Sequence, residues 1–221
     1  MFTIRIDIYT HKWYNYNKDM MRSYVRSRLR IADDTEGCER DMSGSLSGLI
    51  PGGEVKSRIR AMAAEISQDY ADLVSEENPL LLLCTLRGAV FFAADLVRCL
   101  TIPARLDFIK VHSYEGTRAA GMPVFDLGEG IDTAGKQVLI LEDIVDTGRT
   151  MEAVLAHYRA QGAAGIRICT MLDKKERRLP ECQQIQPEYI GFDIPDLFVV
   201  GWGLDYNDRF RLLPDIMVYD P

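Results

Sequence analysis

VLILEDIVDTGRTM, the stretch Val138–Met151, joins an apolar run to two acids and then to a loop of small residues that opens a helix. Val138–Leu141 predicts a strand buried on both faces, because such a strand is apolar throughout instead of alternating. Behind the loop, apolar residues recur at helical spacing at Met151, Val154, Leu155 and Tyr158. Gly162 is placed to end this helix. The stretch therefore predicts a strand, a loop and a helix in direct succession.

The loop of this stretch, Asp146–Thr150, is typical of an anion site. Backbone N–H groups at a helix N-terminus can hold a phosphate, together with the hydroxyl groups of Thr147 and Thr150. Gly148 lets the main chain approach such a ligand closely. Arg149 adds a positive charge.

Two adjacent acids, Glu142 and Asp143, stand between the strand and the loop, where they can bind hydroxyl groups or a cation. Taken alone, such a pair is usually a solvated strand end, and a Thr-Gly step before a helix is usually only a cap. All the pieces in one uninterrupted run, in this order, favour the anion site. The pattern GxGxxG is absent from the run and GxxxxGK[ST] is absent from the chain, which disfavours those two phosphate-binding motifs.

Composition favours a single soluble enzyme domain, with 221 residues, 47% hydrophobic and 27% charged. The formal net charge of −7 argues against a general nucleic-acid surface, since binding to phosphate backbones relies on excess Lys and Arg. The five cysteines follow neither a disulfide framework nor a zinc spacing, which favours reduced thiols in a cytoplasmic protein. The apolar runs are too short for a membrane span, and no secretory segment is indicated near Met1.

Strands and helices alternate from Gly48 onward. Strands are also predicted at Leu80–Thr85, Arg105–Val111, Ile166–Leu172 and Phe198–Trp202, and helices around Val55–Ile66 and Val90–Leu100. This alternation predicts a parallel α/β sheet, in which ligands gather at the carboxyl ends of the strands. Residues 1–47 lack sustained periodicity; Thr3–Tyr9 is a candidate strand and Met20–Ile31 a candidate basic helix.

Glu142–Gly148 resembles the phosphoribosyl-pyrophosphate (PRPP) signature of the type I phosphoribosyltransferases, in the form found in the hypoxanthine-guanine branch. The resemblance covers about residues 48–221, with several separated motifs in family order. It implies an α/β fold, with a parallel central sheet flanked by helices and a small base-binding hood. It also implies two parts, an N-terminal segment of uncertain role at residues 1–47 and a phosphoribosyltransferase domain at residues 48–221.

By this resemblance, the loop Asp146–Thr150 binds the 5-phosphate of PRPP, with Arg149 where many relatives have Lys. Glu142 and Asp143 hold the ribose hydroxyls and, with magnesium as cofactor, supply metal ligands. Asp146 is the expected general base, which takes the imidazole-ring proton of the purine as the new bond forms.

A second anion-binding turn is expected at Leu86-Arg87-Gly88, between a strand and a helix. Alone, such a turn is commonplace and usually only structural. In the resembled family the matching turn has Lys before the Gly, binds pyrophosphate and often contains a cis peptide bond at a residue other than proline. Arg87 keeps the charge of that Lys but changes the geometry of its donors.

Residues 107–121 lead from a strand into Ser113-Tyr114 and a small-residue segment. From composition, an ordinary surface hairpin or linker is at least as well supported as a functional loop. In the resembled family, the Ser-Tyr pair begins a flexible loop that closes over the reaction centre. Such a lid would keep water from a reactive ribosyl cation.

The last third of the chain carries Lys174 behind a strand, and then FVVGWGLDYN at Phe198–Asn207, followed by Phe210-Arg211. Taken singly, these residues are usually core or solvated surface. Their order is similar to the purine-binding end of the hypoxanthine-guanine enzymes. The roles that this implies are a donor to purine O6 at Lys174, ring stacking at Phe198, main-chain reading of the base edge at Val199, a magnesium ligand at Asp205 and a pyrophosphate contact at Arg211. Lys175 is a rival donor to Lys174.

The expected reaction transfers 5-phosphoribosyl from PRPP to a 6-oxopurine base, hypoxanthine or guanine, and yields IMP or GMP and pyrophosphate. A preference for xanthine stays open, as does a PRPP- or nucleotide-sensing regulator on the same fold. Met20–Ile31 is the one feature that favours the regulator. Family resemblance suggests a homo-oligomer, either a dimer or a tetramer, and neither a nucleic-acid nor a membrane partner is expected.

Overall fold

The computed structural model describes residues 44–112, 124–126 and 131–221, and its compact unit begins at Ser45 and ends at Pro221. The candidate elements Thr3–Tyr9 and Met20–Ile31 and the loop residues Ser113 and Tyr114 lie outside the described residues. In the described ranges, none of the helices combines the length and the apolar character that crossing a membrane requires.

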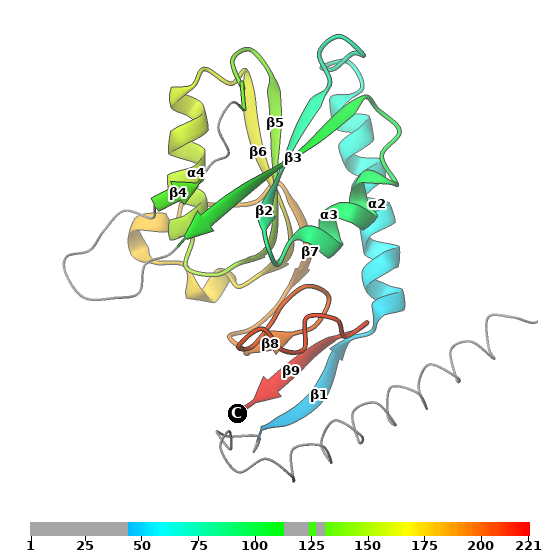
Figure 1. Cartoon of the computed structure of the whole chain (residues 1–221), viewed down its shortest axis with the longest axis vertical. Coiled ribbons are helices and arrows are strands. Elements are labelled where there is room, and N and C mark those ends of the chain that lie inside the picture. The colour runs from blue at the N-terminus through cyan, green and yellow to red at the C-terminus, as the bar shows by residue number, and fades with distance from the viewer. Residues whose placement is uncertain (1–43, 113–123, 127–130) are drawn as a thin grey trace, which may run out of the picture. The chain divides into compact units, whose positions relative to one another are not determined.

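A six-stranded sheet forms the centre of the described unit, in the order β4-β3-β2-β5-β6-β7 (Figure 1). The strands are β2 (Leu80–Leu86), β3 (Ala104–His112), β4 (Val124–Asp126), β5 (Gln137–Val145), β6 (Gly165–Asp173) and β7 (Tyr189–Asp193). Five of them run parallel, and the short β4 pairs with β3 antiparallel at the edge. The parallel central sheet and four of its strands are confirmed, whereas β4 and β7 were not predicted.

The sheet has a hydrophobic core on each face. In β2, Leu80 and Leu82 belong to one core, and Leu81 and Leu83 to the other. Successive side chains of a strand point to opposite faces, so a strand covered on both sides must be apolar throughout. This is the physical basis of the apolar runs from which the strands were predicted.

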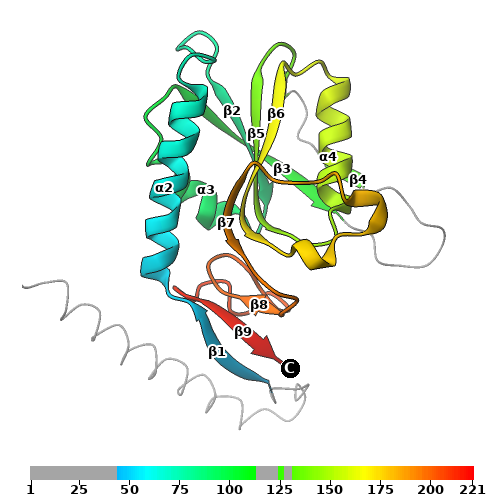
Figure 2. The same ribbon diagram turned by 180° about the vertical axis from the view of Figure 1, so that it is seen from behind.

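Helices cover both faces of the sheet (Figure 2). The first core contains buried residues of α2 (Gly52–Tyr70) and α3 (Val90–Val97), and the second contains those of α4 (Arg149–Ala160). The three helices predicted within the described residues are confirmed, although α3 ends three residues before Leu100. Gly162, just beyond α4, has a φ of 80°, which suits its predicted place at the end of that helix.

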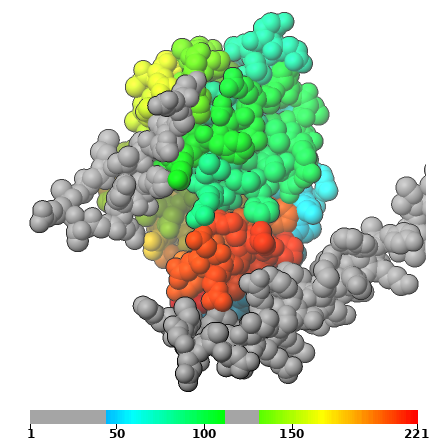
Figure 3. Space-filling view, in the orientation of Figure 1, coloured from blue at the N-terminus to red at the C-terminus, as the bar shows by residue number. Residues whose placement is uncertain are grey.

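A separate three-stranded antiparallel sheet joins the two ends of the described unit, in the order β1-β9-β8. It comprises β1 (Ser45–Ile50), β8 (Val199–Val200) and β9 (Ile216–Asp220). We call this sheet, with the loop of residues 201–215, the hood. Figure 3 shows its C-terminal residues, in orange and red, packed against the green part of the molecule.

The strand expected at Phe198–Trp202 is shorter than predicted, because only Val199–Val200 belongs to β8. The chain turns directly behind it, with positive φ values at Gly201 (94°), Trp202 (49°) and Gly203 (103°). Gly201 also touches the main chain before β9, since a Cβ atom there would lie 2.1 Å from the carbonyl oxygen of Asp215. Left-handed backbone and this close approach end the strand.

Candidate active site

The sheet order brings the predicted motifs to one edge. Strands β2, β5 and β6 are neighbours and run parallel, so the residues that follow them meet at their carboxyl ends. These residues are Arg87 and Gly88 after Leu86, the last residue of β2, Asp146–Thr150 after β5, and Lys174 after β6. The hood reaches the same edge through its loop, where Gly203 contacts Gly88.

Gly88 is the point at which three motifs touch. A Cβ atom at Gly88 would lie 1.5 Å from Asp143 Oδ2, so only glycine fits the close approach of this carboxylate. On another side, a Cβ atom at Gly203 would lie 2.1 Å from the carbonyl oxygen of Gly88. The preceding peptide bond, Leu86–Arg87, is cis. The turn Leu86–Gly88 therefore contacts the acid pair on one side and the hood on another.

The two adjacent acids differ in their surroundings. Glu142 is buried, and the Thr85 hydroxyl lies 3.0 Å from its Oε1. Burial, reinforced by the charge of Asp143, raises the pKa of Glu142 well above its ordinary value. Its Oε2 has no hydrogen-bond partner among the described residues. Asp143 is only partly buried and accepts the main-chain N–H of Ile144 at 2.9 Å, which leaves it the more accessible of the two.

The loop Asp146–Thr150, the predicted 5-phosphate site, leads into an open helix terminus. Gly148, with a φ of 90°, precedes α4, and no side chain among the described residues caps the first turn of that helix. Its N–H groups are therefore available to an anion. The Thr147 carbonyl accepts the main-chain N–H of Leu179 at 3.2 Å. Arg149 points to an exposed ion pair with Glu181 at 3.3 Å.

A chain of alternating charges links the acid of this loop to the predicted purine donor. Arg177 Nε lies 3.0 Å from Asp146 Oδ1, and Arg177 Nη1 lies 3.1 Å from Asp196 Oδ2. The other oxygen of Asp196 lies 3.7 Å from Lys174 Nζ. Arg177 therefore places a positive charge beside the Asp146 carboxylate.

The rival lysines occupy different environments. The side chain of Lys174 is 8% exposed, whereas that of Lys175 is 59% exposed and forms an ion pair with Asp193 at 2.9 Å. The geometry therefore favours Lys174 as the donor, and its role stays a prediction.

Phe198 presents an aromatic ring to the outside of the hood. It is 49% exposed, which is unusual for so large an apolar side chain. Tyr206 supports it from one side in an edge-to-face contact, with ring centroids 5.5 Å apart. Val199, next to it in β8, is buried. A half-exposed ring held by a second aromatic side chain is suited to stacking on a flat ligand.

Two arginines from separate motifs converge on one carboxylate oxygen. Arg87 Nη2 lies 2.8 Å from Asp208 Oδ1, and Arg211 Nη2 lies 3.8 Å from the same atom. Arg211 also lies 2.5 Å from Asp205 Oδ1 and donates to the Gly203 carbonyl. The Asp208 carboxylate therefore bridges the two arginines that are predicted to contact pyrophosphate.

The predicted magnesium ligands do not form a cage of protein atoms. No group of three or more acidic, His or Cys side chains that could hold a metal ion occurs in residues 44–112, 124–126 and 131–221. Glu142 is bonded to Thr85, Asp143 approaches Gly88, and Asp205 is paired with Arg211. Magnesium commonly takes only one or two carboxylates and completes its shell with substrate phosphates and water. These residues fit an ion that arrives with its substrate.

Several residues of the site were not predicted from sequence: Asp173, Arg177, Arg178, Asp196 and Asp208. The run KKERR that follows Asp173 looks like an ordinary solvated charge cluster. In the structure Arg178 is buried, whereas Arg177 next to it is not. Only the tertiary contacts distinguish the two arginines.

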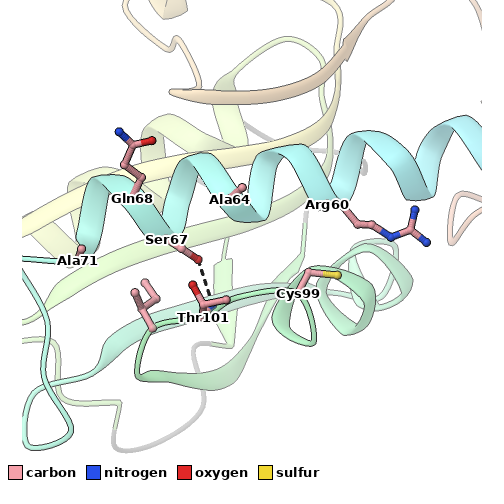
Figure 4. A pocket seen from close by; sticks show the side chains of 8 residues that line it. Arg60, Ala64, Ser67, Gln68, Ala71, Cys99 and Thr101 are labelled. Carbon is pink, nitrogen blue, oxygen red and sulfur yellow. Dashed lines mark hydrogen bonds between the residues drawn. The ribbon is translucent and has the colours of Figure 1, made fainter.

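A groove with a volume of about 710 Å³ lies apart from this site, between α2 and the turn that leads from α3 to β3 (Figure 4). Its lining includes Arg60, Gln68 and Cys99, and the Thr101 main-chain N–H donates to Ser67 Oγ across it at 3.1 Å. Thr101 precedes β3, so the groove is at the amino ends of the strands, opposite the predicted loops.

Anion-binding turns at the carboxyl edge of a parallel sheet, with carboxylates between them and a hood beside them, define a phosphate-handling α/β enzyme. The chain belongs to the phosphoribosyl transferase domain family, whose model matches residues 51–207. The resemblance inferred from the motifs and the fold class are thereby confirmed.

Its relatives are similar over most of their length. It is 39% identical over 176 residues to the hypoxanthine phosphoribosyltransferase of Salmonella typhimurium, covering 78% of this chain and 94% of that protein. It is 37% identical over 177 residues to the hypoxanthine-guanine phosphoribosyltransferase of Mycobacterium avium, covering 79% and 86%. A solved Trypanosoma cruzi hypoxanthine phosphoribosyl transferase is similar in structure, with a TM-score of 0.72 and 38% identity, over 79% of this chain and 95% of that one.

Proposed function

We propose that the protein transfers the 5-phosphoribosyl group of PRPP to hypoxanthine or guanine and releases pyrophosphate, with IMP or GMP as product. The observation that carries this proposal is the arrangement of charge along the carboxyl edge. Arg87 and Arg211 converge on Asp208, the Gly88 that follows Arg87 contacts Asp143 of the acid pair, and the open N-terminus of α4 follows the acid pair along the chain. PRPP has one anionic group at each end of its ribose, and this edge offers a cationic site for each.

The proposed mechanism relies on charge placement. Arg87 and Arg211 neutralise the pyrophosphate as it leaves, and the N–H groups of Gly148–Thr150, with the hydroxyls of Thr147 and Thr150, hold the 5-phosphate. Asp143, between them, favours the positive charge that develops on the ribose. Glu142, Asp143 and Asp205 would hold magnesium, which would supply further positive charge to the leaving pyrophosphate.

The base is recognised by the last third of the chain. Lys174 donates to the 6-oxo group, Phe198 stacks on the ring and the main chain at Val199 reads its edge. Adenine presents an amino donor to the Lys174 ammonium, and a buried donor left unpaired costs about 1 to 3 kcal/mol. Adenine is therefore a poor substrate, whereas xanthine, which keeps the 6-oxo group, is not rejected at this position.

Asp146 takes the proton of the imidazole-ring nitrogen as the bond to ribose forms. Support for this role comes from its place in the sheet: Asp146 follows Val145 of β5, which pairs with Asp173 of β6, and Lys174 follows Asp173. Ser113 and Tyr114 begin the lid of the proposed mechanism. The remaining proposals are a boundary at residue 47, a homo-oligomer, and a cytoplasmic location, which suits the free thiols of buried Cys84 and Cys169.

The experiment measures pyrophosphate release from PRPP and magnesium, with hypoxanthine, guanine, xanthine, adenine or uracil in turn. Wild type is compared with Asp146→Asn, and Asp132→Asn serves as a control, because Asp132 is an exposed acid ion-paired with Lys136 before β5. General-base catalysis contributes about 10²- to 10⁴-fold, so a loss of that size in Asp146→Asn alone is expected.

Full activity of Asp146→Asn would exclude Asp146 as the base while leaving the transferase. If no base supports turnover although PRPP binds, the protein is a PRPP- or nucleotide-sensing regulator instead. The greatest turnover with xanthine would assign the alternative base preference.

A further inference from the structure

Arg178 is a buried arginine that contacts the main chain of the loop Asp146–Thr150. Its guanidinium donates to three main-chain carbonyls: Ile185 at 3.0 Å from Nε, Val145 at 3.0 Å from Nη1, and Asp146, also from Nη1. Nη2 donates to the carboxylate of Asp173. The side chain is 4% exposed.

The stem of this arginine also contacts the loop. A Cβ atom at Gly148 would lie 3.2 Å from Arg178 Cδ, so the arginine packs against the residue that precedes α4. The next main-chain N–H, at Leu179, donates to the Thr147 carbonyl at 3.2 Å. Arg178 and its neighbour therefore hold consecutive residues from Val145 to Gly148.

Asp146 is held at both ends by adjacent arginines. Arg178 binds its main-chain carbonyl, and Arg177 binds its carboxylate at 3.0 Å. The position of the carboxylate relative to the N-terminus of α4 thus depends on both contacts. A buried charge is costly unless it is paired and hydrogen-bonded, and ordinary core packing does not require one at this place.

We propose that Arg178 is a positioning residue for PRPP, which fixes the main chain of the loop so that Asp146 and the N–H groups of α4 stand at a set separation. This inference rests on the proposed function. Arg178 touches no substrate in this role; it acts through Val145, Asp146 and Gly148. The main-chain N–H of Lys174 shares the Val145 carbonyl with Arg178, at 3.0 Å, whereas the Lys174 ammonium, the predicted purine donor, is held by the salt bridge to Asp196.

The test variant is Arg178→Lys. Lysine keeps a positive charge near Asp173, but it lacks the planar guanidinium whose several N–H groups reach the three carbonyls. Magnesium–PRPP binding is measured by calorimetry, and KM is measured for PRPP and for hypoxanthine. A displacement of about 1 Å can cost on the order of 10²-fold in rate, so kcat/KM for PRPP should fall by about 10- to 100-fold, and the calorimetric affinity for magnesium–PRPP should fall with it. KM for hypoxanthine should stay within about twofold, since a loss confined to one substrate marks the site that was disturbed.

The matched control is Arg58→Lys. Arg58 also uses its guanidinium on main-chain carbonyls, those of Ile190 (2.6 Å from Nη2) and Gly191 (3.1 Å from Nε), but it joins α2 to β7 away from the loop. We expect some loss of thermal stability in this control and an unchanged PRPP affinity. Equal effects of Arg58→Lys and Arg178→Lys on PRPP would reduce Arg178 to general stability and overturn the proposal.

Asp173→Asn separates the carbonyl contacts from the buried ion pair, and it serves also if Arg178→Lys does not fold. This variant keeps the guanidinium and its three carbonyl partners, so PRPP affinity should remain within about threefold of wild type. The melting temperature should fall, because the buried guanidinium loses its carboxylate partner. A tenfold or greater fall would assign the effect to the ion pair and overturn the proposal. Wild type that binds no PRPP would refute the proposed function itself, whereas wild-type binding with unchanged Arg178→Lys refutes only the positioning role.

Discussion

Asp208 occupies the place where we expect pyrophosphate, and its removal should tighten pyrophosphate binding. Its Oδ1 lies 2.8 Å from Arg87 and 3.8 Å from Arg211. A bound pyrophosphate must take over both arginines and must also lie close to a carboxylate of its own sign. Asp208→Asn keeps the shape of the side chain but removes this internal competitor.

The expected gain in pyrophosphate affinity follows from the solvent exposure of the side chains that pair with Asp208. The side chains of Arg87 and Asp208 are 68% and 70% exposed, and exposed ion pairs contribute about 0.2 to 1 kcal/mol each. Loss of both pairs therefore releases about 0.4 to 2 kcal/mol, or about twofold to thirtyfold in the dissociation constant of pyrophosphate. The lower part of this range is expected, because the contact with Arg211 is long and Asp205 also holds that arginine.

The assay is calorimetric titration of magnesium pyrophosphate at low ionic strength, repeated at high salt, where screening should reduce the difference between variant and wild type. Asp132→Asn is the control, because Asp132 is 72% exposed and paired with Lys136 at 2.8 Å, yet lies before β5 at the other end of the strand. Unchanged or weaker binding to Asp208→Asn would refute the reasoning. An equal gain in both variants would attribute the effect to net charge.

Lys174→Met should lower kcat/KM for hypoxanthine by about 5- to 150-fold, the equivalent of 1 to 3 kcal/mol, and reduce discrimination against adenine. Steady-state kinetics of Lys175→Met should match wild type, because that ammonium is exposed. Phe198→Leu should raise KM for the base by about 2- to 13-fold, from a ring contact of about 0.5 to 1.5 kcal/mol, while urea unfolding shows a nearly unchanged free energy. Glu142→Gln should raise the melting temperature of the ligand-free protein near neutral pH. The folded pKa of this carboxyl is raised above its ordinary 4.5, so the folded state loses stability as pH rises from that value toward the raised pKa. The melting temperatures of Glu142→Gln and wild type should converge below about pH 4, where Glu142 is protonated in both the folded and the unfolded state. A difference that persists there would contradict this cause.

Much of the fold follows from local patterns. The apolar runs of β2 and β5 are readable because both faces of these strands are covered, and the helical spacing of Val55, Ile59, Met62 and Ile66 marks the buried side of α2. The hood was harder to predict. β1 and β9 pair across nearly the whole unit Ser45–Pro221, with Ser45 opposite Asp220, and no local pattern encodes a partner so distant.

The sequence by itself determined that a strand, an acid pair, a small-residue loop and a helix follow one another from Val138 onward. These pieces are contiguous, and each of them depends only on nearby residues. Only tertiary structure decided which charges are used. It buried Lys174 and left Lys175 exposed, placed Arg178 under the loop, and brought Arg87 to Asp208 over a separation of 121 residues. The physical reason is that burial and ion pairing depend on what packs around a side chain, and those neighbours come from distant parts of the chain.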